Sequence, residues 1–359
     1  MKKLVTEFNT NISSQQRESV AMAGQEWDQL RFKGIVEGTL IISSASDPKA
    51  SRIYEEGVDY EVNYAEGKVR RLSGSAIPDL SKNSAYGLPP RSVDLSKVVN
   101  FSTYHCANFS VYATYDFNSE INDTYDDVIN EINSKNATAL PLKLAEKVKA
   151  GGKIVYGVVG DSISTGAEAT PDNDFFSLLK AYLESLNDNL SVEVVNVAVG
   201  GTTSLSGPEG VCKLYNELGK EPDLITIAYG MNDQNSETDE PGSSPEFYIS
   251  NINSTVRAPS LYTEKNLPEI ILITSMPANP VWNYTSGGSV ILADALRTYA
   301  KENNLPIADV NALFDSELAH GKSYEELITS LINHPGNYGH YLYFLALKSL
   351  IDAALSELG

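Results

Sequence analysis

The second half of the sequence alternates short apolar runs with longer amphipathic segments, and this alternation restricts the fold more than any other feature. Two of the amphipathic segments, 175–186 and 341–358, carry apolar residues at helical spacing. Short strands buried on both faces by crossover helices give such apolar runs. The sequence therefore predicts an α/β domain of three layers (α/β/α) around a largely parallel sheet. The expected strands are 154–159, 192–198, 224–228, 270–274 and 307–308.

The first 120 or so residues show a different pattern, in which apolar and polar residues alternate. Alternation over 58–64, the turn Glu66-Gly67 and the return at 69–72 indicate a β-hairpin. Further strands are expected at 35–42, 98–101 and 109–115. We predict a smaller β-sandwich or jelly-roll-like domain with its linker over residues 1–145 and the α/β domain over residues 146–359. The boundary falls within a short helical pattern that ends at Gly151-Gly152.

Composition excludes several classes of partner. The 359 residues carry a formal net charge of −20, which opposes binding to nucleic acid and to anionic lipid surfaces. Polar residues interrupt the basic N-terminal segment before an apolar stretch develops, and no long apolar run follows. We therefore expect a cytoplasmic protein that does not enter membranes, while a homo-oligomer stays open. Cys106 and Cys212 are too few for a disulfide framework.

Three loops that follow predicted strands carry candidate chemistry, because sites in open parallel sheets form beyond the carboxyl ends of strands. The first is Gly160-Asp161-Ser162-Ile163-Ser164, a tight turn that would expose the serine hydroxyl at the start of a helix. Ser164 stands where the GxSxG elbow needs its second glycine. Taken alone, this stretch could equally be a turn with a serine cap.

The next two loops offer hydrogen-bond donors, and a fourth segment offers a base. Gly201 follows the second strand and Asn232 the third, and such N–H groups are what an oxyanion hole requires. As isolated motifs both are more often plain turns. His334 precedes the last helix, and an imidazole with an unperturbed pKa of about 6.5 suits a general base.

These four motifs stand in the order typical of one family, and residues 150–359 resemble the SGNH (GDSL-like) hydrolase superfamily. The resemblance implies a flavodoxin-like catalytic domain and an acyl-transfer reaction that needs no metal or organic cofactor. It implies Ser162 as nucleophile and His334 as base. Gly201, Asn232 and the backbone N–H of Ser162 would form the oxyanion hole.

One departure from that family concerns the residue that orients the histidine. Members usually carry an aspartate three residues before it, and this chain has Leu331 there. A backbone carbonyl, giving a Ser-His dyad, is the alternative we favour. The carboxylates left open are Asp309, which could equally cap its loop, and Glu325 or Glu326, which we interpret as a solvent-exposed helix face.

The remaining polar residues near the motifs are assigned structural roles. We expect His340 to orient the loop or to begin the final helix. Asp161 and Asp233 are expected to bond backbone N–H groups near the serine and the asparagine.

The layout of a β-rich part before an SGNH domain resembles that of some carbohydrate esterases. This resemblance implies an oligosaccharide or small-molecule ester as substrate, with an acetyl ester expected. Trp282 and Tyr284 could stack on sugar rings or fill surface and core. An arylesterase or thioesterase for small acyl groups is an alternative. A non-catalytic glycan-binding protein that keeps the fold is another.

Overall fold

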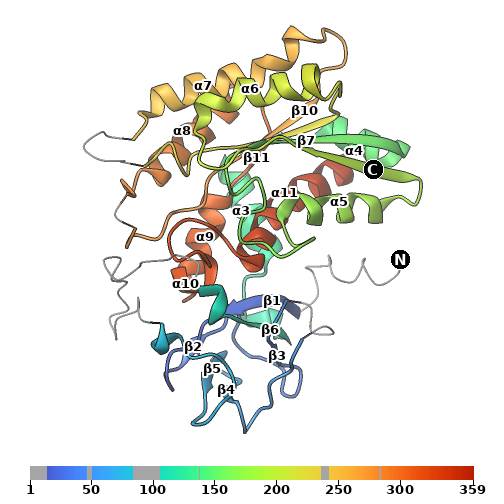
Figure 1. The fold of residues 1–359 in the computed structure, drawn as a ribbon. Coiled ribbons are helices and arrows are strands. Elements are labelled where there is room, and N and C mark those ends of the chain that lie inside the picture. The colour runs from blue at the N-terminus through green and yellow to red at the C-terminus, as the bar shows by residue number, and fades with distance from the viewer. Residues whose placement is uncertain (1–13, 47–50, 84–105, 137, 236–241, 283) are drawn as a thin grey trace.

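A five-stranded parallel sheet forms the centre of the molecule in the computed structural model, which describes residues 14–46, 51–83, 106–136, 138–235, 242–282 and 284–359 (Figure 1). The strand order is β8-β7-β9-β10-β11, which is the flavodoxin-like order 2-1-3-4-5. The strands coincide with the five apolar runs of the sequence. They are β7 (Gly152–Gly160), β8 (Leu190–Asn196), β9 (Leu224–Ala228), β10 (Glu269–Ile273) and β11 (Ile307–Ala308).

Helices cover both faces of this sheet, as Figure 1 shows, and each face has its own apolar core. The predicted three-layer α/β/α architecture is therefore confirmed. One face packs against α3 (Tyr125–Asn136), α4 (Leu142–Ala150), α5 (Phe175–Leu186) and α11 (Asn337–Glu357). The other packs against α6 (Gly207–Cys212), the π-helix η7 (Lys213–Glu217), α7 (Pro245–Arg257) and α8 (Ser289–Glu302). Short 3₁₀ segments are η2 (Leu80–Lys82), η4 (Cys106–Asn108), η5 (Ser119–Ile121), η6 (Ser204–Ser206) and η8 (Ala258–Leu261).

The N-terminal part forms a smaller β domain of two three-stranded antiparallel sheets, with strand orders β1-β6-β3 and β2-β5-β4. The predicted hairpin is present as β4 and β5. The run 35–42 gives a strand only at its end, since Ile35 makes an isolated bridge to Phe117. The run 98–101 lies outside the described residues. The strands are β1 (Ser14–Val20), β2 (Asp28–Gln29), β3 (Ile41–Ser43), β4 (Tyr60–Asn63), β5 (Lys68–Arg71) and β6 (Val111–Asp116).

Buried charges join the β domain to the segment before the last helix. That segment consists of α9 (Val310–Ala319) and α10 (Tyr324–Leu327), which Figure 1 shows above β1 and β6. The Nζ of Lys322 lies 2.8 Å from a carboxylate oxygen of Glu18 in β1 and 2.8 Å from one of Glu326 in α10. Arg31 pairs in the same way with Glu317, 2.7 Å apart. Buried charges are tolerated only when paired, so these contacts fix one part against the other.

Two further expectations concern the domain boundary and membrane-spanning helices. The boundary near residue 145 stays a prediction, although α3 and α4 already pack with α11. Within the described ranges, none of the helices combines the length and the apolar character needed to cross a bilayer.

Candidate active site

Ser162 lies in a tight turn directly after β7, and the packing at the end of that strand dictates the turn. A Cβ on Gly160 would lie 2.2 Å from the Oγ of Ser164 and 2.4 Å from the carbonyl oxygen of Ala228, so only glycine fits there. The Asp161 carboxylate accepts a hydrogen bond of 3.0 Å from the N–H of Ile163, which closes the turn on the other side. The serine is left half-buried between these fixed neighbours.

The turn lies where the order of the sheet reverses. Strands β7 and β9 are neighbours, with Gly160 opposite Ala228, but the chain leaves them toward opposite sides of the sheet. Crevices that bind ligands form at such points, outside the carboxyl ends of the strands. The loops that carry Ser162 and Asn232 therefore emerge side by side.

The structure brings His334 against the serine hydroxyl, although the two residues are 172 positions apart in the sequence. The Nε2 of His334 lies 2.7 Å from the Oγ of Ser162, a hydrogen-bond distance. The backbone N–H of His334 donates a 2.8 Å hydrogen bond to the Oγ of Ser330, which fixes the main chain that carries the ring. In this arrangement the imidazole can take the serine proton when the oxygen attacks a carbonyl.

The predicted oxyanion donors lie on two loops at the same edge of the sheet as Ser162. A Cβ built on Gly200 would lie 3.7 Å from the Cβ of Ser162, so the glycine loop faces this serine. The adjoining Gly201 has a φ of 77° that favours glycine. The Nδ2 of Asn232 donates to the carbonyl oxygen of Thr202 over 2.9 Å. This bond uses one of the two amide hydrogens and ties the asparagine to the glycine loop.

Asp161 and Asp233 brace these loops from behind, as the sequence suggested. The Asp233 carboxylate accepts hydrogen bonds from the N–H of Ser204 over 3.1 Å and from the Ser204 hydroxyl. These bonds join the loop after β9 to the loop after β8. Burial raises the pKa of the Asp161 carboxyl to about 7 and also raises the pKa of Asp233. Both carboxyl groups are therefore part of the support for the site rather than of its exposed face.

Asp309, the first predicted orienting acid, is engaged at the end of β11. It accepts hydrogen bonds from Arg297 over 2.7 and 2.8 Å and from the Thr274 hydroxyl over 3.0 Å. It also caps α9 through the N–H of Ala312. Burial alone would raise the pKa of Asp309, but the hydrogen bonds and the charge of Arg297 outweigh it. The pKa of this carboxyl is therefore lowered. Its contacts support the alternative role of capping and bracing its own loop.

The interpretation of Glu325 and Glu326 as a solvent-exposed helix face is wrong. Their exposed fractions are 7% and 2%, because α10 packs against β1 of the β domain. Glu326 forms a capping box with Ser323 and the ion pair with Lys322. Burial raises the pKa of Glu325 to about 7. The pair serves the junction with the β domain, which a reading of local periodicity does not reveal.

Leu331 occupies the place of the aspartate expected from the resemblance, and its conformation is strained. Its φ is 80°, in the left-handed region that costs a side-chain-bearing residue roughly 1–2 kcal/mol. The side chain is fully buried in a small apolar cluster with Ala21, Leu80 and Cys106 of the β domain. Full burial of a leucine contributes about 1.5–3 kcal/mol, which offsets that strain.

His340 lies in the first turns of α11 and contacts the loop that carries Ser162. Its Nε2 is 3.1 Å from the carbonyl oxygen of Ala167, and its ring stacks on that of Phe175. Burial lowers the pKa of His340 to about 4, so the ring is neutral at physiological pH and donates to Ala167. The expectation that His340 orients a loop or begins the helix agrees with this placement.

The two aromatic residues proposed for sugar stacking have different surroundings. Trp282 is 7% exposed and belongs to the main core, so it cannot offer its face to a ligand, whereas Tyr284 is 45% exposed. Their loop reaches the Asn232 loop, because the Thr285 hydroxyl donates to the Gln234 side chain over 2.8 Å. Only the tyrosine is therefore available as a platform.

Sequence reasoning missed two residues that hold the histidine segment, Ser330 and Asn279. The backbone N–H of Asn279 donates to the carbonyl oxygen of Ile332 and its Nδ2 to that of Leu331, both over 2.8 Å. The only signal in the sequence was that Asn279 follows the fourth strand, at the edge of the sheet where sites form.

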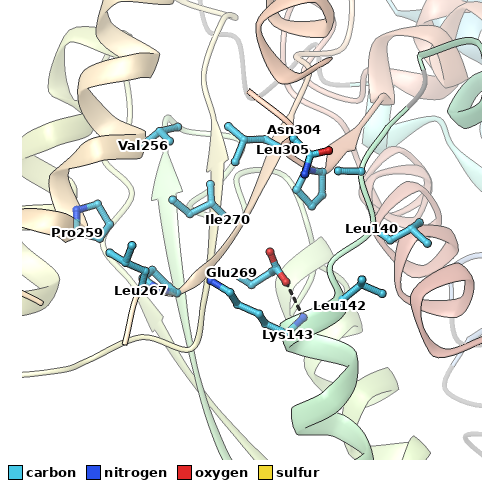
Figure 2. Close-up of a pocket in the computed structure, with 13 residues that line it drawn as sticks. Leu140, Leu142, Lys143, Val256, Pro259, Leu267, Glu269, Ile270, Asn304 and Leu305 are labelled. Atoms are coloured by element: carbon cyan, nitrogen blue, oxygen red, sulfur yellow. Dashed lines mark hydrogen bonds between the residues drawn. The ribbon is translucent and has the colours of Figure 1, made fainter. Parts of the chain in front are cut away.

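A separate pocket of about 430 Å³ lies at the opposite edge of the sheet, where β10 and β11 begin (Figure 2). Its lining is mainly apolar. The Glu269 carboxylate there accepts from the backbone N–H of Lys143 over 3.0 Å, which caps the start of α4. This pocket is thus remote from the serine. Among the described residues, no three His, Cys, Asp or Glu side chains gather as a metal site.

The chain resembles a known family and several solved structures. No curated protein sequence matches the chain. Solved structures that align with part of it include the three that follow. A two-domain esterase active on acetylated mannans, crystallised with mannopentaose, is 20% identical over 62% of this chain and 57% of its own, with a TM-score of 0.47. The chain thus spans little more than half the length of that esterase.

The other two are shorter proteins. The acetylxylan esterase Axe2 from Geobacillus stearothermophilus is 21% identical over 56% of this chain and 95% of its own, with a TM-score of 0.44. LAE5, an α/β hydrolase from the metagenome of Lake Arreo, Spain, is 22% identical over 57% and 97%, with a TM-score of 0.45. The model of the GDSL-like lipase/acylhydrolase family matches residues 158–342, just over half of the 359 residues. The chain therefore belongs to the GDSL-like lipase/acylhydrolase family.

Proposed function

We propose that this protein is a serine ester hydrolase in which Ser162 is the nucleophile and His334 its base. The observation that carries the proposal is the 2.7 Å separation between the Nε2 of His334 and the Oγ of Ser162. A serine hydroxyl is a weak nucleophile, and a hydrogen-bonded base is what activates it. The family match supports ester chemistry at this pair.

In the first half of the reaction His334 takes the Ser162 proton while the oxygen attacks the ester carbonyl. The negative charge that develops on the carbonyl oxygen is stabilised by the N–H groups of Ser162 and Gly201 and by the second amide hydrogen of Asn232. The imidazolium then gives its proton to the departing alcohol. Water, activated by the same imidazole, releases the acid from the serine and restores the enzyme.

We propose that the substrate is a carbohydrate ester of a small acyl group, namely an acetyl ester. Gly200 and Gly201 are exposed, and Tyr284 offers an aromatic ring on the loop that contacts the Asn232 loop. An exposed glycine loop beside Ser162 fits an acyl group carried on a bulky alcohol, and an aromatic ring can stack on sugars. An arylesterase or thioesterase for small acyl groups would use the same machinery.

Hydrolysis of 4-nitrophenyl acetate by Ser162→Ala tests the reaction, with Ser164→Ala as the matched control. Removing a catalytic serine lowers turnover by about 10⁴- to 10⁶-fold. The Oγ of Ser164 is buried and makes no hydrogen bond with any described residue, so its removal should leave the rate near wild type. Equal rates for Ser162→Ala and wild type would reject the proposal, and equal rates at the level of uncatalysed hydrolysis would favour a non-catalytic protein.

Two further measurements address the site and the substrate. A fluorophosphonate should label the wild-type protein at Ser162 and leave Ser162→Ala unlabelled. Acetylated oligosaccharides should be hydrolysed faster than esters of the same sugars with longer acyl chains. A preference for long chains would overturn the assignment to small acyl groups.

A further inference from the structure

The segment that carries His334 is a short turn whose internal hydrogen bonds converge on one hydroxyl. The Oγ of Ser330 accepts from the N–H of His334 over 2.8 Å and from that of Asn333 over 3.1 Å. The N–H of Ser330 donates back to the carbonyl oxygen of His334 over 3.3 Å. Ser330 thus makes residues 330–334 one unit, whose position depends on how the turn is held to the rest of the molecule.

An apolar side chain holds the turn from the side of the β domain. Leu331 is fully buried with Ala21, Leu80 and Cys106, whose exposed fractions are all 0%. These partners follow β1 and lie in η2 and η4, so the turn inserts its leucine into the β domain. Since the φ of Leu331 is 80°, the backbone keeps this conformation against its own preference, and the buried side chain is what holds it there.

A side-chain amide holds the same turn from the side of the sheet. Asn279 follows β10 and is 2% exposed. Its Nδ2 and its backbone N–H donate to two successive carbonyl oxygens of the turn, those of Leu331 and Ile332, each over 2.8 Å. Both donors are buried, so the turn cannot shift without leaving them unsatisfied.

We propose that Leu331 and Asn279 are the positioning residues of His334, acting from the two sides of its turn. Resting on the proposed function, this inference assigns the β domain a part in catalysis. The β domain holds the turn by packing around Leu331, and the sheet side holds it through the hydrogen bonds of Asn279. Together they hold the imidazole at 2.7 Å from Ser162. Neither residue touches the reacting atoms.

The test measures kcat and KM for 4-nitrophenyl acetate on folded protein, per active site titrated with a fluorophosphonate. A misplacement of about 1 Å in a catalytic group costs about 10²-fold in rate. Leu331→Ala and Asn279→Asp should each lower kcat by about that factor with KM little changed. Leu331→Met, which keeps the apolar volume, should recover most of the loss.

Two further variants separate positioning from general stability. Asn187→Asp is the matched control for Asn279→Asp, because the Nδ2 of Asn187 also donates to backbone carbonyls, those of Val148 and Lys149, but at the opposite edge of the sheet. Its kcat should equal that of wild type. Leu331→Asp should be no more active than Leu331→Ala, because the carboxylate would enter an apolar cluster.

The outcomes are distinct. Wild-type kcat in folded Leu331→Ala or folded Asn279→Asp overturns the inference, as does an equal loss in Asn187→Asp. If Leu331→Ala does not fold, Asn279→Asp decides. An inactive wild-type protein that resists the fluorophosphonate contradicts the proposed function instead, and the two failures are thereby told apart.

Discussion

The two halves of the proposed catalytic pair are held in different ways. The turn of Ser162 is fixed by its own neighbours, since Gly160 admits no side chain and Asp161 closes the turn through a bond two residues away. The turn of His334 is fixed by residues remote in sequence, among them Asn279, which is 52 positions away from Leu331.

This difference has a consequence for what each half tolerates. A local turn fails when its own geometry is disturbed, whereas a turn held from outside fails when a distant partner is lost. The Ser162 side should therefore be most sensitive to changes beside it. The histidine side should be sensitive to changes in the β domain. Three substitutions test this comparison.

Lys322→Met should have the largest effect on stability. It changes the junction with the β domain, on which the histidine side depends. It leaves the carboxylates of Glu18 and Glu326 buried without their cation, and breaking a buried pair costs about 3–5 kcal/mol. Denaturant unfolding measures the loss. In Lys348→Met, the matched control, the carboxylate left behind belongs to Asp352, whose side chain is 40% exposed, so the loss should be small. Similar losses in both variants would contradict the prediction.

Gly160→Ala should have the second-largest effect on stability. It changes the turn of Ser162 itself. The added methyl group would meet the Ala228 carbonyl oxygen at 2.4 Å, and such overpacking against backbone costs about 3 kcal/mol. The free energy of unfolding and the rate of fluorophosphonate labelling should both fall. Gly200→Ala places its methyl group at an ordinary 3.7 Å from Ser162 and should unfold like wild type. If the two variants unfold alike, the packing argument is wrong.

Asp161→Asn should give the smallest effect, seen as a change in pH dependence. The folded state holds the carboxyl proton up to a pKa of about 7, against 3.8 ordinarily. Between these values the unfolded state binds fewer protons, so stability falls as pH rises, by up to about 1.4 kcal/mol per pH unit. The amide cannot titrate, so unfolding measured at pH 5 and pH 7 should show a shallower fall in the variant. Asp188→Asn, at an exposed position, should keep the wild-type slope.

The same difference explains how much the sequence predicts. The five strands, helices α5 and α11, and the hairpin of β4 and β5 follow from local periodicity, and the nucleophile turn follows from adjacent residues. The contacts of Asn279 and Ser330 could not be predicted, because asparagine and serine are common in loops of every kind. Glu325 and Glu326 were misjudged because their burial comes from a part of the chain some 300 residues earlier, with Glu18 304 positions before Lys322.

The ion pair between Glu18 and Lys322 also bears on the order in which the molecule is assembled. The ends of a long loop meet only at an entropic cost, and contacts between distant residues form slowly. The contacts that shape the Ser162 turn, by contrast, lie within β7, β9 and the residues that follow them. A chain synthesised from its N-terminus can complete that turn while Lys322 is still to be made. The Ser162 hydroxyl would then be in place before His334 reaches it, and hydrolytic activity would be the last property that the folding protein acquires.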